Sequence, residues 1–191
     1  MNPITHLLTG WCLAETAPDL TKREKRLVTL AAVAPDFDGF GLIAEWATQD
    51  SPDPLLWWTD YHHILGHNLP FACAAAAAAA LLARRSRPLL TGFLVFLAVH
   101  LHILGDLTGS RGPDDYPWPI PYLWPFSSDP QLTWPGQWYL NAWPNFAVTI
   151  ALLAMTFYLA WRRGSSIVGL VSPRGDAAFV EMLRLRFGRP R

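Results

Sequence analysis

The chain has 191 residues, which is enough for one domain, and its composition is unusual for a soluble enzyme. Hydrophobic residues make up 51% of it and charged residues only 16%, a profile typical of a membrane protein with short polar loops. Lysine plus arginine and aspartate plus glutamate balance at 15 each, so no overall basic field indicates a nucleic-acid partner.

The first predicted elements are two helices, over Pro3–Glu15 and over residues 22–34. Thr21 and Glu24 have the spacing of a capping box at the start of the second helix. That helix should end before Pro35, because the residue before a proline avoids helical geometry. Strands are not expected, since no useful length of sequence alternates apolar and polar residues, so the chain is predicted to be all-α.

Three apolar stretches are candidates for membrane spans: residues 69–83, 88–109 and 143–161. The first includes a run of alanines over residues 74–80 and is short for a span, which needs about 20 residues. The third is bracketed by tryptophans and followed by two arginines, which are the expected anchors at a membrane surface. These stretches predict an integral protein of a bacterial-type inner membrane.

Basic residues near the spans give a divided answer on orientation. Those at 84–87 and 162–163 favour a cytoplasmic position for the ends that carry them. Those at 22–26 belong to an N-terminal region that also has to reach the candidate metal ligands described below. The side of the membrane that these ligands face is therefore left open.

Two further segments flank the last span. Residues 108–145 are dense in proline, tryptophan and tyrosine, and this long loop is interpreted either as a plug in the headgroup region or as a lid over a site. Residues 1–164 are interpreted as the membrane domain and residues 165–191 as a basic C-terminal piece. That piece is either an unstructured tail or a helix lying on the membrane surface.

All six histidines lie in three short stretches, at His6, within residues 62–67 and within residues 100–102. Between the first two stretches, Asp36 and Asp38 form a carboxylate pair on a predicted loop. Imidazole and carboxylate are ligand types that zinc, manganese and iron share. Because ionisable groups beside membrane-depth sequence are costly, this clustering predicts a metal site.

The last histidine stretch has the spacing of a ligand pair on a helix. His102 and Asp106 are four residues apart, so they project from one helix face and could hold one ion. His100 is two residues from His102 and is expected to point away from that face.

The middle stretch is less regular. His63 and His67 have the four-residue spacing, whereas His62 and His67 are five apart and point in different directions on an ideal helix. His62 and His67 could share a site only if the helix begins or breaks between them, which Gly66 allows. Which of His62, His63 and His100 bind an ion directly is left open.

The order of these motifs resembles the YdjM-like membrane-bound metal-dependent hydrolases, over roughly residues 5–126. The motifs that carry the resemblance are His6-Leu7-Leu8, Pro35-Asp36-Phe37-Asp38, residues 62–69, residues 102–106 and Leu123-Trp124-Pro125. The family pattern has arginine and serine where this chain has His63 and Asn68. The family is in turn similar to zinc-dependent phospholipase C and P1 nuclease, which are all-α enzymes with clustered zinc ions.

The resemblance implies a helix cluster at the membrane interface that binds one or two divalent ions, zinc foremost. The candidate ligands are His6, Asp36, Asp38, His62, His67, His102 and Asp106. By the same resemblance, Asp106 would bridge two ions. His67, His102 and one aspartate of the pair would complete the shell of one ion, and His6 would serve the other.

These ligands suggest the chemistry of a hydrolase. A bound Zn²⁺ lowers the pKa of its water to about 7, and two ions can clamp the oxygens of a phosphoester. Asp38, or whichever aspartate of the pair does not bind the ion, is the candidate to position the water, and Arg111 is the nearest candidate to hold a phosphate oxygen. The predicted function is hydrolysis of a phosphoester in a membrane lipid or lipid-linked substrate. The alternative is a non-catalytic membrane protein that binds or transports a divalent metal.

Overall fold

The computed structural model describes residues 1–112 and 117–190, and this part of the chain is mostly helical. The helices are α1 (Pro3–Glu15), α2 (Lys22–Ala31), the 3-10 helix η1 (Ala34–Phe40), α3 (Gly41–Thr48), α4 (Trp57–Tyr61), α5 (Leu69–Leu82), α6 (Pro88–Gly109), α7 (Trp143–Arg163), the 3-10 helix η2 (Ile167–Leu170) and α8 (Pro173–Phe187). Strands β1 (Ile120–Pro121) and β2 (Gln131–Leu132) pair antiparallel within the long loop. The all-α prediction is confirmed, apart from these two short strands.

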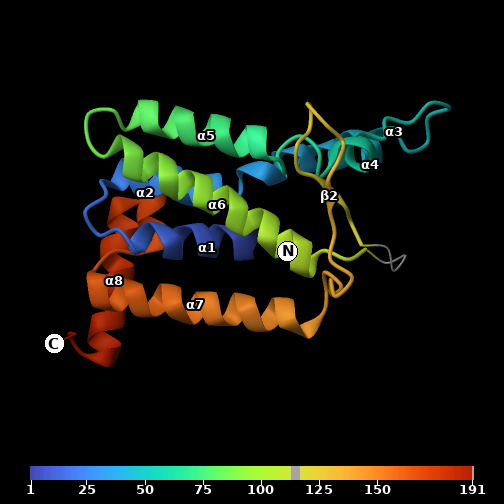
Figure 1. The fold of residues 1–191 in the computed structure, drawn as a ribbon. Helices are drawn as coiled ribbons and strands as arrows, with labels where there is room; N and C mark the ends of the chain where they lie inside the picture. Colours follow the sequence, from blue (N-terminus) through green and yellow to red (C-terminus); the bar gives the residue numbers. More distant parts are fainter. Residues whose placement is uncertain (113–116, 191) are drawn as a thin grey trace.

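Five of the helices, α1, α2, α5, α6 and α7, lie alongside one another as a bundle (Figure 1). One end of the bundle carries the α1–α2 turn, the α5–α6 turn and α8, and we call it the α8 end. The opposite end carries the long loop before α7, with α3 and α4 projecting beyond it, and we call it the loop end. The apolar core lies between the helices, around Val28, Val95 and Val99.

Two helices are long and apolar enough to cross a membrane, α6 and α7, as the sequence predicts. The third candidate is α5, whose 14 residues make it about 21 Å long, less than a typical bilayer core. Helix α5 is therefore shorter than a span should be, and it packs along α6. Taken together, helix α2 and the segment of η1 and α3 are also long and apolar enough to cross a membrane, although the two parts are bent by 52° relative to each other.

The capping box predicted at the start of α2 is confirmed, and it has a second role. Thr21 and Glu24 bond reciprocally, each side chain accepting from the other's backbone N–H. The buried Glu24 carboxylate also accepts hydrogen bonds from the backbone N–H of Arg87 and the hydroxyls of Ser86 and Thr91. One side chain thereby fastens α2 to the α5–α6 turn.

Helix α2 ends at Ala31, three residues before the predicted end, and the chain continues as η1. Pro35 lies in the first turn of η1, where its missing N–H costs nothing. The tighter winding of a 3-10 helix carries Asp36 and Asp38 across the loop end of the bundle, where the sequence predicted an open loop.

The C-terminal piece is folded over the residues that the structure describes, while Arg191 lies outside them. Asp176 accepts hydrogen bonds from the backbone N–H and the hydroxyl of Ser166, at 2.6 and 2.7 Å, so the start of α8 is tied to the segment after α7. Phe179 makes an edge contact with Phe157 of α7. Residues 173–187 form a helix, as one of the two alternatives has it, and the position of this helix on the membrane surface stays a prediction.

Candidate metal centre

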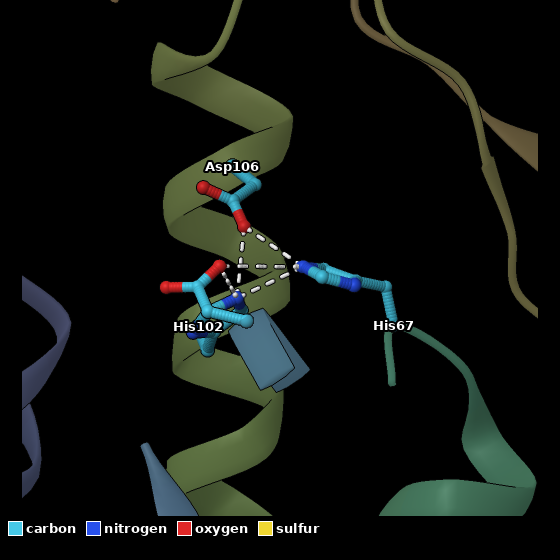
Figure 2. A group of neighbouring side chains, drawn as sticks. His67, His102 and Asp106 are labelled. Atoms are coloured by element: carbon cyan, nitrogen blue, oxygen red, sulfur yellow. Dashed lines mark hydrogen bonds and ion pairs between the residues drawn. The ribbon is translucent and has the colours of Figure 1, made fainter. Parts of the chain in front are cut away.

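Four potential ligand atoms converge at the loop end of the bundle, from η1, the segment before α5 and the end of α6. They belong to Asp36, His67, His102 and Asp106, and all lie within 4.8 Å of one another. Figure 2 shows the shortest of these contacts. His102 Nε2 is 2.9 Å from Asp106 Oδ2 and 3.0 Å from His67 Nε2, and His67 Nε2 is 3.3 Å from the same oxygen. Asp36 Oδ1 completes the group, 3.5 Å from His102 Nε2.

Helix α6 supplies two of the four residues through its own periodicity. His102 and Asp106 lie one turn apart on a continuous helix, so their side chains meet on one face, as their spacing predicts. His100 points elsewhere: its Nδ1 contacts the Phe96 carbonyl and its Nε2 contacts the Tyr122 hydroxyl, at 2.8 and 2.7 Å. The expectation that His100 turns away is confirmed.

The segment that carries His67 is not helical between Tyr61 and Leu69, so the helix break that Gly66 allows is present. Gly66 packs directly against Pro35 of η1, and a β-carbon at that position would lie 2.5 Å from the Pro35 backbone. Only glycine allows this approach. The contact brings His67 beside Asp36, although the two residues are distant in sequence.

In His67 and His102, the contacts of Nδ1, which faces away from the group, determine whether Nε2, which faces into it, carries a hydrogen or a lone pair. His102 Nδ1 lies 2.8 Å from the Ala32 carbonyl, and His67 Nδ1 lies 3.4 Å from Asp38 Oδ2. Both neighbours can act as acceptors, so a hydrogen on each Nδ1 would leave each Nε2 with a lone pair directed into the group.

In this tautomer the group consists of acceptors, and acceptors that converge in a buried place are stabilised by a cation. Among the described residues, Asp106 Oδ2 and Asp36 Oδ2 are buried without a hydrogen-bond partner. Two imidazole nitrogens and two carboxylates are a donor set that suits zinc and similar divalent ions. The residues present could hold one such ion.

In the metal-free protein a proton takes the place of that cation. Burial lowers the pKa of His67, but its close contacts with Asp106 and Asp38 and the charges of these carboxylates outweigh it and raise the pKa to about 9. A metal ion that binds here would have to displace a proton from His67.

Two predicted ligands, Asp38 and His62, lie beside the four-residue group but not within it. The Asp38 side chain is 1% exposed, and its Oδ1 is 2.7 Å from His62 Nδ1 while its Oδ2 faces His67. His62 also stacks on Trp58, with ring centroids 3.8 Å apart. Asp38 thus orients two imidazoles from behind. Its expected role in positioning a water stays a prediction.

His6 approaches the group from the opposite side of Asp106. Its Nε2 is 3.2 Å from Asp106 Oδ1, and its ring stacks on His102 at 3.7 Å between centroids. The amino group of Met1 lies against the same oxygen. The two oxygens of Asp106 therefore face different partners, which is the arrangement that a carboxylate bridging two ions would need.

Arg111 lies outside this group. Its guanidinium donates to the Pro135 carbonyl, and its backbone N–H donates to the Trp138 carbonyl at 3.1 Å. These contacts connect the end of α6 to the long loop. A phosphate contact by Arg111 remains a prediction.

His63 is a site residue that the sequence noted only as an alternative. It has a φ of 68°, in the left-handed region, which is uncommon for a side chain other than glycine. Its Nε2 is 4.0 Å from Asp106 Oδ2. Burial, followed by the charge of His67, lowers the pKa of His63, so this imidazole stays neutral. Its place in the histidine cluster and its four-residue spacing to His67 were the sequence signals for it, and the strained backbone was not visible there.

A cavity of about 450 Å³ opens over these side chains. Its polar lining consists of Asn2, Asp36, His62, His63, Asp106 and Ser110, and its apolar lining includes Val33, Phe37, Phe40, Trp58, Trp118 and Leu140. Trp118 and Leu140 come from the long loop, so part of this loop covers the site as a lid would. The loop's residues 113–116 lie outside the described residues. Such a cavity suits a molecule with a polar group and a hydrophobic body.

The long loop is fastened at the base of this cavity. The buried Gln137 side chain donates to the Asp106 carbonyl at 2.8 Å, and Asn145 donates to the Gly109 carbonyl at 2.9 Å. These bonds satisfy carbonyls at the C-terminal end of α6, which have no partner within the helix.

Comparison with known proteins gives one match. A family model described as YdjM inner membrane protein matches residues 1–173, which include the four-residue group and the cavity. No curated protein and no solved structure matches the chain.

Proposed function

The chain belongs to the YdjM inner membrane protein family, and from this premise we propose that it is a membrane-bound, metal-dependent hydrolase acting on a phosphoester of a lipid or lipid-linked substrate. One observation carries the proposal. Four acceptor side chains converge under a cavity whose walls are largely apolar. The arrangement supports a cation at the polar floor and a hydrophobic molecule above it.

Asp36, His67, His102 and Asp106 would hold the first ion, with zinc as the proposed metal. Asp106 and His6 would hold a second ion. When bound, such ions acidify a water and act as Lewis acids toward phosphoryl oxygens.

The chain's own side chains would do the remaining work. Asp38 keeps His67 and His62 in place through both of its oxygens. His63, which lines the cavity and stays neutral, is our candidate to take or deliver a proton at the ester. The aromatic walls would exclude water and hold the hydrophobic part of the substrate.

The test is an assay of purified protein in detergent, stripped with chelator and reloaded with zinc. The substrates are phosphatidic acid, a chromogenic phosphomonoester and a chromogenic phosphodiester. We expect turnover of at least one of them by the reloaded protein and by His100→Ala, and none by the stripped protein or by His102→Ala. His100 is the matched control, because it lies on the same helix but contacts Tyr122 and not the group.

Two outcomes would contradict the proposal. Turnover that survives His102→Ala would locate the chemistry elsewhere. Full metal occupancy with no turnover of any phosphoester would leave a metal-binding membrane protein without this activity.

A further inference from the structure

An apolar groove of about 560 Å³ runs along the bundle beside the metal cavity. Helices α1, α2, α5 and α6 contribute to it, and every residue that lines it is apolar. From the loop end toward the α8 end, the lining passes from Phe37 through Leu30 and Ala75 to Leu27 and Leu82. Val95, near the middle of α6, forms part of its floor, so the groove lies at the depth of the bilayer's hydrocarbon.

The alanine run of α5 makes the groove. Ala75, Ala78 and Ala79 line it, and a side chain that ends at the β-carbon leaves space where a leucine would fill it. None of the residues in this run belongs to the metal centre. Shaping the groove would therefore explain the alanine run, which plays no part in the metal centre.

The groove adjoins the metal cavity. Pro3, Val33 and Phe37 line both of them. Phe37 is 66% exposed, so no described part of the chain covers the junction between the two spaces. A polar floor with metal ligands thus lies at one end, and a purely apolar channel leads away from it along the helices.

We propose that the groove binds one hydrocarbon chain, acyl or isoprenoid, of the same lipid whose phosphate lies in the metal cavity. This inference rests on the proposed function for the phosphate, whereas the chain subsite rests on the groove itself. An amphiphile with a single phosphate head and a long chain matches both spaces in polarity and in order. The groove would hold the chain at a fixed position and so bring the ester to the ligands.

The test compares two leucine substitutions on adjacent exposed alanines of α5. Ala78 lines the groove and Ala77 does not, so Ala78→Leu should obstruct it while Ala77→Leu serves as the matched control. The probe is phosphatidic acid with a photoactivatable diazirine in its chain, in phosphatidylcholine nanodiscs. Labelled peptides from α1, α2 and α5 are quantified by mass spectrometry.

We expect groove labelling in the unaltered protein and in Ala77→Leu. In Ala78→Leu it should fall about tenfold, because displacing roughly two methylene groups from an apolar site costs that much affinity. Labelling no stronger than on the exposed face of α7, or unchanged in Ala78→Leu, would overturn the inference. So would a helix from another protein found crosslinked in the groove in place of the probe.

This readout is separable from hydrolysis. Labelling needs no turnover, so it is measured with the chelator-treated protein and with His102→Ala as well. Groove labelling without phosphoesterase activity would retain the chain subsite and reject the proposed function. Phosphoesterase activity without groove labelling would retain the proposed function and reject the chain subsite.

The distribution of positive charge carries a second, independent inference. Among the described residues, every lysine and arginine except Arg111 lies on the segments at the α8 end of the bundle (Figure 1). They are Lys22, Arg23, Lys25, Arg26, Arg84, Arg85, Arg87, Arg162, Arg163, Arg174, Arg184, Arg186 and Arg189. In the sequence, the basic residues at 22–26 left the orientation in the membrane undecided. The fold places them with the other basic residues, because α2 begins at the α8 end.

We infer that the α8 end faces the cytoplasm and that the metal centre opens on the opposite, outer side of the inner membrane. Lysine and arginine close to the ends of spans are retained on the cytoplasmic side. The loop end carries Asp36, Asp38, Glu45 and Asp60 instead. A substrate would then have to come from the outer leaflet or from the space beyond it.

The orientation is tested with single cysteines in a variant in which Cys12 and Cys73 are replaced by alanine. Ser128→Cys reports on the exposed loop end and Glu181→Cys on the exposed face of α8. A membrane-impermeant maleimide should label Ser128→Cys in intact spheroplasts, and Glu181→Cys only after lysis. The reverse pattern, or labelling of both before lysis, would overturn the orientation.

Discussion

Replacing Asp106 by asparagine is the sharpest test of the metal centre. The carboxylate is 2% exposed, and its Oδ2 faces the inner nitrogens of both His67 and His102. Asparagine keeps the size of the side chain and removes its charge. The packing around α6 should therefore survive while the electrostatic attraction for a divalent ion is lost.

The expected loss of affinity is large. Removing one charged partner from a buried pair costs about 3–5 kcal/mol, or about two to four orders of magnitude in a dissociation constant. Asp38→Asn is the matched comparison, since Asp38 touches His67 from behind and does not face the inner nitrogens. Substituting such an outer partner costs about 10–100-fold. The structure thus predicts an order: native protein, then Asp38→Asn, then Asp106→Asn.

Zinc affinity would be measured by competition with a chromophoric chelator in detergent, and stoichiometry by elemental analysis of the purified proteins. Circular dichroism of each variant checks that the helices remain. The reasoning is refuted if Asp106→Asn binds zinc as tightly as the native protein, or if Asp38→Asn is the weaker of the two variants.

Three further predictions follow from particular contacts. With a pKa of about 9, His67 is protonated in the metal-free protein, so zinc binding near pH 7 should release about one proton from it and tighten as the pH rises toward 9; calorimetry in buffers of different ionisation enthalpy measures this. Gly66→Ala should lower zinc occupancy, as found by elemental analysis, because its β-carbon would displace the segment from Pro35. Glu24→Ala should lower stability by about 1–3 kcal/mol, because buried donors lose a charged acceptor, whereas Glu181→Ala on an exposed face should change little in thermal denaturation.

The part of the site that lies on one helix could be predicted from the sequence. His102 and Asp106 meet because helical periodicity alone fixes their relation, and His100 turns away for the same reason. The capping box at Thr21 and Glu24 is equally local. Such features need no knowledge of the rest of the chain.

The contacts between distant segments could not be predicted in the same way. Asp36 and Asp38 were equivalent in the sequence, yet Asp36 faces the group and Asp38 faces the outer side of His67. The winding of η1 decides which is which, and Pro35 against Gly66 sets the distance. The left-handed backbone of His63 has no counterpart in a pattern of residue types.

The same limit applies to the helices. Length and apolar composition identified α6 and α7 as spans, but the alanine run of α5 looked like a weak span and is a wall of a groove. The small alanine side chains form a groove only because α1 and α2 supply its other walls. The orientation in the membrane could not be predicted for a related reason. Basic residues indicate the cytoplasmic side only when it is known which end of the bundle carries them.

The four ligands come from η1, the segment before α5 and the end of α6, in that order along the chain. During synthesis, Asp36 and His67 leave the ribosome before α5, whereas His102 and Asp106 follow only with the end of α6. An ion held by all four side chains would therefore be captured only after α6 has been made, and it would hold three separately delivered stretches of chain together. Cells starved of the metal should accumulate an inserted precursor that proteases cleave readily between α2 and α5.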